Sequence, residues 1–223
     1  MPTPAGLAEW REVADTAVDA AVASHVEGDH VLLLRRWRRE GAPTVLLVHG
    51  IGMGQQYFGL LREALSAELD VIALDLPGFG SSPEPAESMP MPELADFVAD
   101  ALRGIVGEPV IALGHSMGTQ VVAELAARHP EAVDRVVLIA PTVNPRERSG
   151  WQQAWRLLQD LANDPPIVAL VGARMCAQTG LRWYLRKLRS MLAHDVRDVL
   201  PRVLQPTLVI RGEEDRVVPE DWA

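Results

Sequence analysis

The sequence predicts an α/β fold in which a mostly parallel sheet is covered by helices on both faces. Short, uninterrupted apolar runs alternate along the chain with segments whose apolar residues recur at helical spacing. Uninterrupted apolar strands indicate burial on both sides, which is typical of a parallel sheet between helices. A second observation is the motif Gly114-His115-Ser116-Met117-Gly118, which directly follows one apolar run and opens a helical pattern. Functional groups in such a fold gather at the carboxyl ends of the strands.

The elements follow one another in a regular order. Residues 7–21 have apolar side chains at helical spacing and predict an amphipathic helix, and residues 31–34 predict an early strand. Further strands are expected at 45–48, 71–74, 110–113, 136–139 and 207–210, with helices around 58–65, 94–105 and 121–126. Four arginines after the early strand (Arg35, Arg36, Arg38 and Arg39) are interpreted as a solvated edge or turn. The proline-rich segment 81–92 is expected to be an exposed connection.

The alternation breaks after Pro141. Residues 142–204 contain only helical patterns, and the strand at 207–210 then resumes the sheet. We therefore expect a core of residues 1–141 and 205–223 with an inserted helical cap of residues 142–204. Most aromatic and aliphatic residues of the cap are interpreted as packing residues. Trp183 and Tyr184 are candidates for lining a substrate pocket, because one face of a cap must be directed toward the site that it covers.

Composition excludes several classes of protein. The 223 residues carry a net charge of −9 with both signs mixed and no basic stripe, which argues against nucleic-acid binding. The single cysteine, Cys176, excludes an intramolecular disulfide and fits a reducing compartment. Charged residues interrupt the N-terminal segment before it could act as a signal peptide, and no uncharged run is long enough to span a membrane. We expect a cytoplasmic protein that acts on a small molecule without cofactor or metal; its oligomeric state is left open.

Ser116 is the candidate nucleophile. A serine on a tight turn between a strand and a helix projects its hydroxyl above the sheet, and glycines at positions 114 and 118 leave room for that turn. The backbone N–H of Met117 would then point at a developing oxyanion. The alternative, that Ser116 merely caps the following helix, explains neither glycine.

The segment His49-Gly50-Ile51-Gly52 follows the expected strand 45–48. A His-Gly pair at this place shapes a turn that brings a backbone N–H into the site, so Ile51 is the candidate for the second oxyanion donor. His49 is interpreted as structural rather than as the general base. Asp215, in the turn after strand 207–210, is the candidate carboxylate for orienting an imidazole.

Together these motifs resemble the α/β-hydrolase superfamily over nearly the whole chain, and Asp75-Leu76-Pro77-Gly78-Phe79-Gly80-Ser81-Ser82 adds to the resemblance. The resemblance implies the order serine, then acid, then histidine, yet no histidine follows Asp215. It also implies a further strand and helix that this sequence lacks, which would leave strand 207–210 with a bare edge. We therefore expect a truncated copy or fragment of a longer hydrolase. Of the histidines present, only His194 in the cap could swing toward Ser116.

The resemblance implies a serine hydrolase that cleaves an ester or related acyl bond of a small, largely apolar substrate through an acyl-enzyme. The same framework also serves acyl transfer, C–C bond cleavage and haloperoxidase chemistry, and these stay open. The alternative hypothesis is an inactive or fragmentary protein of this fold, which lacks the histidine of the triad and acts by binding or not at all. A third is that a partner chain or neighbouring segment supplies the missing elements.

Overall fold

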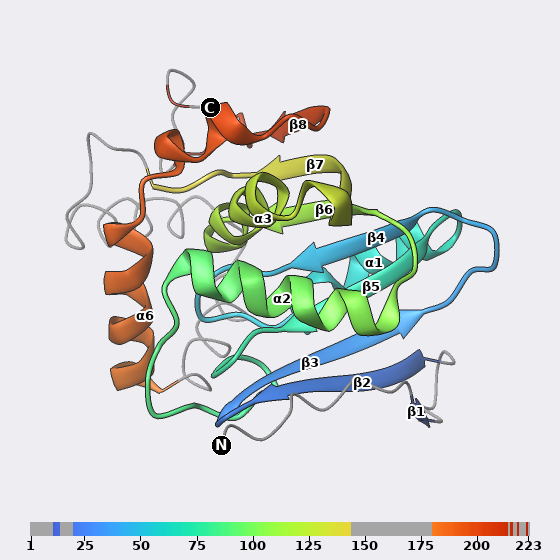
Figure 1. The fold of residues 1–223 in the computed structure, drawn as a ribbon, viewed down its shortest axis with the longest axis horizontal. Coiled ribbons are helices and arrows are strands. Elements are labelled where there is room, and N and C mark those ends of the chain that lie inside the picture. The colour runs from blue at the N-terminus through green and yellow to red at the C-terminus, as the bar shows by residue number, and fades with distance from the viewer. Residues whose placement is uncertain are drawn as a thin grey trace.

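A computed structural model describes residues 11–13, 20–143 and 180–213, together with Asp215, Val218 and Trp222. In these residues eight strands form one sheet in the order β1-β2-β3-β5-β4-β6-β7-β8 (Figure 1). The strands are β1 (Arg11–Val13), β2 (Ala20–Glu27), β3 (His30–Trp37), β4 (Thr44–Val48), β5 (Asp70–Asp75), β6 (Val110–His115), β7 (Val133–Ile139) and β8 (Thr207–Ile210). The five strands from β5 to β8 in this order are parallel, and β1 to β3 pair antiparallel. The prediction of a mostly parallel sheet is confirmed.

Helices cover both faces of this sheet. The described helices are α1 (Gly59–Ser66), α2 (Met91–Ile105), α3 (Met117–Arg128) and α6 (Leu181–Ala193), with short 3₁₀ turns η1 (Gln55–Phe58), η2 (Pro130–Ala132), η4 (Val196–Asp198) and η5 (Leu200–Arg202). On one face α2 and α3 pack on a core that includes Leu46, Ile72 and Val136. On the other face α1 and η1 pack on a smaller core that includes Leu47 and Val71. Strands β4 and β5 are therefore buried from both sides, which explains their uninterrupted apolar sequences.

The N-terminal helix prediction is wrong where the structure describes that segment. Residues Arg11–Val13 and Ala20–Glu27 are strands, and β2 forms an antiparallel hairpin with β3 in which Glu27 faces His30. Gly28 (φ +61°) supplies the left-handed residue that the two-residue turn needs. The Gly28-Asp29 pair was the local signal for this turn, and the alanine-rich stretch before it fits a helical period as well as a strand. The early-strand prediction for residues 31–34 is confirmed, because they lie within β3.

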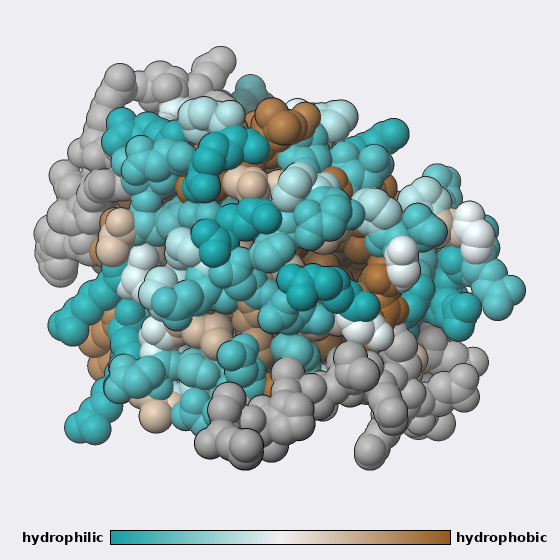
Figure 2. Space-filling view, in the orientation of Figure 1, coloured by the Kyte–Doolittle hydropathy of each residue, from teal (hydrophilic) through white to brown (hydrophobic). Residues whose placement is uncertain are grey.

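Between β7 and β8 the described residues contain α6, η4 and η5 and no strand. This agrees with the helical pattern, while residues 144–179, which include Cys176 and the first half of the expected cap, lie outside the described residues. Figure 1 shows α6 standing across the end of the sheet toward which the parallel strands point. Strand β8 is at the sheet edge and all four of its residues are exposed. Hydrophobic side chains gather at this edge (Figure 2), where Leu208 is 56% exposed.

Candidate active site

Ser116 lies in a strained turn between β6 and α3. Its backbone angles are φ 53° and ψ −119°, a conformation that non-glycine residues rarely adopt. Strain of this kind costs about 1–3 kcal/mol and persists only where the surroundings enforce it. The Ser116 N–H donates to the carbonyl oxygen of Ile139 at 3.0 Å, which ties the turn to β7. The Ser116 side chain is half-buried, at the carboxyl edge of the central parallel strands.

The two glycines of the motif are required by close backbone approaches. A Cβ added at Gly114 would lie 2.4 Å from the carbonyl oxygen of Gly118. A Cβ added at Gly118 would lie 2.2 Å from the carbonyl oxygen of Val48 on β4. Because both obstacles are backbone atoms, no side-chain movement can relieve them. The turn therefore brings the beginning of α3 against the end of β4. Met117 is the first residue of α3, so its N–H has no acceptor inside the helix.

His49 joins the loop after β4 to the loop after β5. Its Nε2 accepts the Leu76 backbone N–H at 3.1 Å, because a backbone N–H can only donate. Nδ1 therefore carries the proton and donates to the carbonyl oxygen of Gly50 at 2.8 Å. Burial lowers the pKa of His49, which keeps this neutral form. Both ring nitrogens are engaged, in agreement with the interpretation of His49 as structural.

These contacts also orient the peptide that carries the Ile51 N–H. The Gly50 carbonyl oxygen accepts the His49 ring proton and also the Met53 N–H at 3.3 Å. In a trans peptide the C=O and the following N–H point in opposite directions. With the carbonyl held on one side, the Ile51 N–H must point to the other. Gly50 itself lies against Ser116, since a Cβ added there would lie 3.1 Å from the Cβ of Ser116.

Asp75, which stands at the start of the motif of residues 75–82, connects two loops of the candidate site. Its buried carboxylate accepts the Gln55 N–H at 2.7 Å and the Ser81 N–H at 3.1 Å. Two glycines pack directly against this carboxylate. A Cβ added at Gly80 would lie 2.2 Å from Oδ1, and a Cβ added at Gly54 would lie 2.8 Å from the same atom. Asp75 therefore fastens the loop that carries Ile51 to the loop after β5. The sequence signal for this role was a carboxylate at the end of an apolar strand, followed by closely spaced glycines.

His115 precedes Ser116 at the end of β6 and packs against η1. The ring of Tyr57, in η1, stacks on it with centroids 4.7 Å apart, and the Tyr57 hydroxyl lies 3.3 Å from Nε2. Burial, and secondarily the nearby His49, lower the pKa of His115 to about 4. The ring is therefore neutral at pH 7 and holds η1 against the turn of the nucleophile.

All six histidines of the chain lie in the described residues. The remaining four contact other parts of the molecule. His25 packs on Phe97 at 4.8 Å between ring centroids, and Nε2 of His30 is 3.0 Å from the carbonyl oxygen of Glu87. Nε2 of His129, just after α3, is 2.7 Å from Oδ1 of Asp96 on α2, and Nε2 of His194, just after α6, is 2.8 Å from Oε1 of Glu124 on α3. Glu124 lies about two turns along α3 from Ser116. His194 is therefore held away from the nucleophile by a buried partner.

Asp215 lies in a turn after β8. Its N–H donates to the carbonyl oxygen of Gly212 at 3.2 Å, and its Oδ1 accepts the Val218 N–H at 2.9 Å. Strands β6, β7 and β8 are parallel neighbours, so Asp215 and Ser116 follow strands that end at the same edge of the sheet. Two strand spacings, about 10 Å, separate these strands.

The two pocket candidates differ in exposure. Trp183 is 1% exposed, and its ring lies so close to Gly78 that an added Cβ there would be 2.1 Å from Nε1. Trp183 thus packs α6 onto the loop after β5, whereas Tyr184 is half-buried. One turn further, buried Lys187 donates from Nζ to the carbonyl oxygen of Met89 at 2.8 Å, and burial lowers its pKa to about 8. Contact of Trp183 and Tyr184 with a substrate stays a prediction.

Among the described residues, no group of three His, Cys, Asp or Glu side chains is placed to hold a metal ion. Within the same part of the chain, no helix has both the length and the apolar character needed to cross a membrane. The arrangement offers a strained serine with the Gly50 backbone against it, and a carboxylate after a strand that ends at the same edge of the sheet. Such a set is suited to nucleophilic attack on a carbonyl group.

Comparison with known proteins agrees with this fold. The profile of the alpha/beta hydrolase fold family matches residues 43–170. The chain is 32% identical, over 173 residues, to the dihydrolipoyllysine-residue acetyltransferase component of the acetoin cleaving system of Cupriavidus necator, covering 75% of this chain and 46% of that protein. The chain therefore spans about half the length of this relative. It is 28% identical to the pimeloyl-[acyl-carrier protein] methyl ester esterase of Aeromonas hydrophila, covering 80% of this chain and 79% of the esterase.

Among solved structures, the enol-lactonase of Burkholderia xenovorans LB400 superposes with a TM-score of 0.73. The superposition covers 87% of this chain and 83% of the lactonase at 21% sequence identity. At this level of identity the similarity supports the shared fold alone.

Proposed function

Because the chain belongs to the alpha/beta hydrolase fold family and is esterase-like by its relatives, we propose that it is a serine hydrolase. The proposed reaction cleaves a carboxylic ester or related acyl bond of a small, largely apolar substrate through an acyl-enzyme. One observation carries this proposal: Ser116 occupies a strained turn that exists only because residues 114 and 118 lack side chains. A serine that merely capped a helix would not need this strain.

In the proposed mechanism Ser116 attacks the carbonyl carbon, and the N–H groups of Met117 and Ile51 stabilise the oxyanion. Loss of one such donor typically removes about 2.7–4 kcal/mol of transition-state stabilisation. Collapse of this intermediate breaks the ester bond and expels the alcohol, which takes up the proton lost by Ser116. Water then hydrolyses the acyl-enzyme, releasing the carboxylic acid and restoring the Ser116 hydroxyl. His49 and Asp75 serve this step indirectly, because they fix the loop and the peptide that present the Ile51 N–H. We also propose that residues 142–204 form a cap and that Trp183 and Tyr184 face the substrate.

Deprotonation of Ser116 needs a base, and Asp215 is proposed to orient an imidazole between β8 and the nucleophile. None of the six histidines supplies that imidazole in this structure, since each is held in a contact described above. This observation favours a second candidate function for the 223 residues: a protein of this fold that binds an acyl compound without turnover. The two candidates differ in whether Ser116 becomes nucleophilic when an imidazole is present.

The deciding experiment is covalent labelling by a fluorophosphonate, read by intact mass, with and without added free imidazole. The serine hydrolase proposal predicts a single adduct on the chain that forms faster with imidazole and is lost in Ser116→Ala. Ser81→Ala, which removes an exposed serine outside the turn, is the matched control and should label like the unchanged chain. A folded protein that shows no adduct even with imidazole contradicts the proposal and supports binding without turnover.

A further inference from the structure

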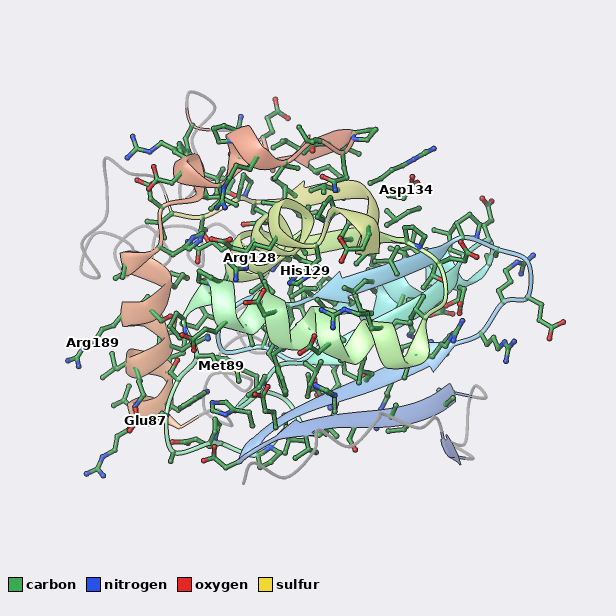
Figure 3. All side chains as sticks on the ribbon, viewed as in Figure 1. Glu87, Met89, Arg128, His129, Asp134 and Arg189 are labelled. Atoms are coloured by element: carbon green, nitrogen blue, oxygen red, sulfur yellow. The ribbon has the colours of Figure 1, made fainter. Side chains whose placement is uncertain are left out.

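The outer face of α6 concentrates positive charge on an otherwise acidic chain. The helix contains four basic residues and no acidic one, whereas the whole chain has a net charge of −9. Arg182, Arg186 and Arg189 are spaced i, i+4 and i+7, so they share one side of the helix, and all three are exposed. We call these three residues the arginine face. In Figure 3 the side chain of Arg189 extends from α6 away from the rest of the molecule.

Apolar side chains adjoin the arginine face. Leu181 is 74% and Leu185 46% exposed, so both add apolar area to the surface beside the arginines. The opposite side of α6 contributes Trp183, Lys187 and Met191, which are all buried. The helix is therefore anchored to the core while it presents arginines and leucines outward. Arginine is enriched in protein interfaces, and exposed leucines beside it add apolar area that a partner can bury.

The cationic groups of this face are incompletely neutralised by the part of the chain that the structure describes. Arg186 donates to the carbonyl oxygen of Ala86 and lies 5.8 Å above the Trp183 ring. Arg182 and Arg189 take part in none of the ion pairs between described residues. The nearby acidic groups belong to the loop before α2: Glu84 lies beside Gly180, and Glu87 is labelled near α6 in Figure 3.

We propose that the arginine face, with Leu181 and Leu185, docks an acidic protein surface. The arginines extend over about 10 Å of helix, so the complementary surface is a segment with carboxylates at helical spacing and an apolar residue between them. Guanidinium groups bind carboxylates through two parallel hydrogen bonds, which gives such a contact direction as well as charge attraction. Because Trp183 anchors α6 on the loop after β5, the docked partner sits at the rim of the candidate site. Docking at this face does not depend on turnover by Ser116.

A lipid surface fits these observations less well. Helices that bind in the membrane interface bury an apolar face several ångströms deep, about 5–10 Å. The apolar face of α6 is already used in the core, which leaves two leucines for insertion. A small acidic partner contacts only the arginine face. An anionic membrane is an extended surface, so the net negative charge of the chain would repel it.

The test uses the full 223-residue chain and a fluorescent helical peptide with glutamates along one side and leucines beside them. Fluorescence anisotropy is measured for this peptide and for a twin in which glutamine replaces glutamate. We expect the glutamate peptide to bind at least tenfold tighter than its twin. The triple variant R182Q/R186Q/R189Q should lose at least tenfold, whereas R38Q/R39Q/R103Q, which changes the net charge equally elsewhere, should stay within twofold.

Other outcomes overturn the proposal. Equal losses in the two triple variants would mean that bulk charge and not this face binds the peptide. Unchanged binding by R182Q/R186Q/R189Q would exclude the face altogether. Sedimentation with phosphatidylserine vesicles that is lost in that variant, together with no peptide binding, would assign the face to lipid. Far-ultraviolet circular dichroism checks folding, and Leu181→Ser/Leu185→Ser, which keeps every charge, should weaken peptide binding severalfold.

Discussion

Strands β6 and β8 belong to the same parallel sheet and each ends in a candidate catalytic residue, but their surroundings differ. Strand β6 lies between β4 and β7 and is covered by helix α3, and the turn that follows it is fixed by backbone contacts on both sides. Strand β8 pairs with β7 on one side, and its four residues are all exposed. The turn of Ser116 is thus imposed by its neighbours, whereas the turn of Asp215 is held by local hydrogen bonds. We infer that the two halves of the candidate site differ in how strongly the fold specifies them.

The largest expected effect comes from filling the turn of Ser116. Gly118→Ala places a Cβ 2.2 Å from a backbone oxygen of β4, so we expect a loss of more than about 4 kcal/mol in the free energy of unfolding. Gly107→Ala is the control, because an added Cβ there meets nothing within 4 Å. It should change stability by no more than about 1 kcal/mol. Urea denaturation measures both, and equal midpoints would show that the turn is not sterically fixed.

Truncation of a leucine should destabilise the protein much more in the interior of the sheet than at its edge. Leu138→Ala, in β7 at 2% exposure, should destabilise the protein by about 2–5 kcal/mol because it opens a cavity. Leu208→Ala, in β8 at 56% exposure, should lower stability by less than about 1 kcal/mol. Thermal and urea unfolding of the two variants provide the comparison. A similar loss for both would mean that β8 is covered in solution.

Acid should lower the free energy of unfolding. Burial lowers the pKa values of His25 and His49 and that of His115 to about 4, so these rings are neutral when folded and protonate on unfolding. The unfolded chain binds more protons between about pH 4 and 6.5, so stability falls as the pH drops through this window. His115 alone accounts for about 2 kcal/mol at pH 5. His115→Asn should flatten the pH dependence of urea midpoints, and Leu208→Ala should leave its slope unchanged.

The smallest effect on folding is expected at Asp215. Asp215→Asn keeps an oxygen that can accept the Val218 N–H, so stability should change by less than about 0.5 kcal/mol. If Asp215 orients an imidazole, the same variant should lower the rate of ester hydrolysis measured with added free imidazole by up to about 10⁴-fold. Unfolding curves and initial rates on a p-nitrophenyl ester separate the two roles. A large loss of stability with an unchanged rate would make Asp215 structural.

Local sequence was sufficient for the features that depend on near neighbours in the chain. The apolar runs of β4 to β8 and the glycines around Ser116 predicted a parallel sheet and a tight turn, because burial on two faces and steric crowding leave direct marks on residue type. The helix prediction for the N-terminal segment was wrong because its local residue pattern does not favour one element. Its alanine-rich pattern fits two periods, and pairing with β3 decided in favour of a strand.

The sequence by itself determined the fold class and the place of the tight turn that carries Ser116, and it shows no histidine after Asp215. Only the tertiary structure decided where the six histidines point, that Asp75 joins two loops, and that α6 presents arginines outward above a buried Trp183. These features depend on residues far apart in the chain, such as Asp75 with Gln55 and His194 with Glu124. No local pattern encodes such pairings, because hydrogen bonds and burial are fixed by which elements pack together.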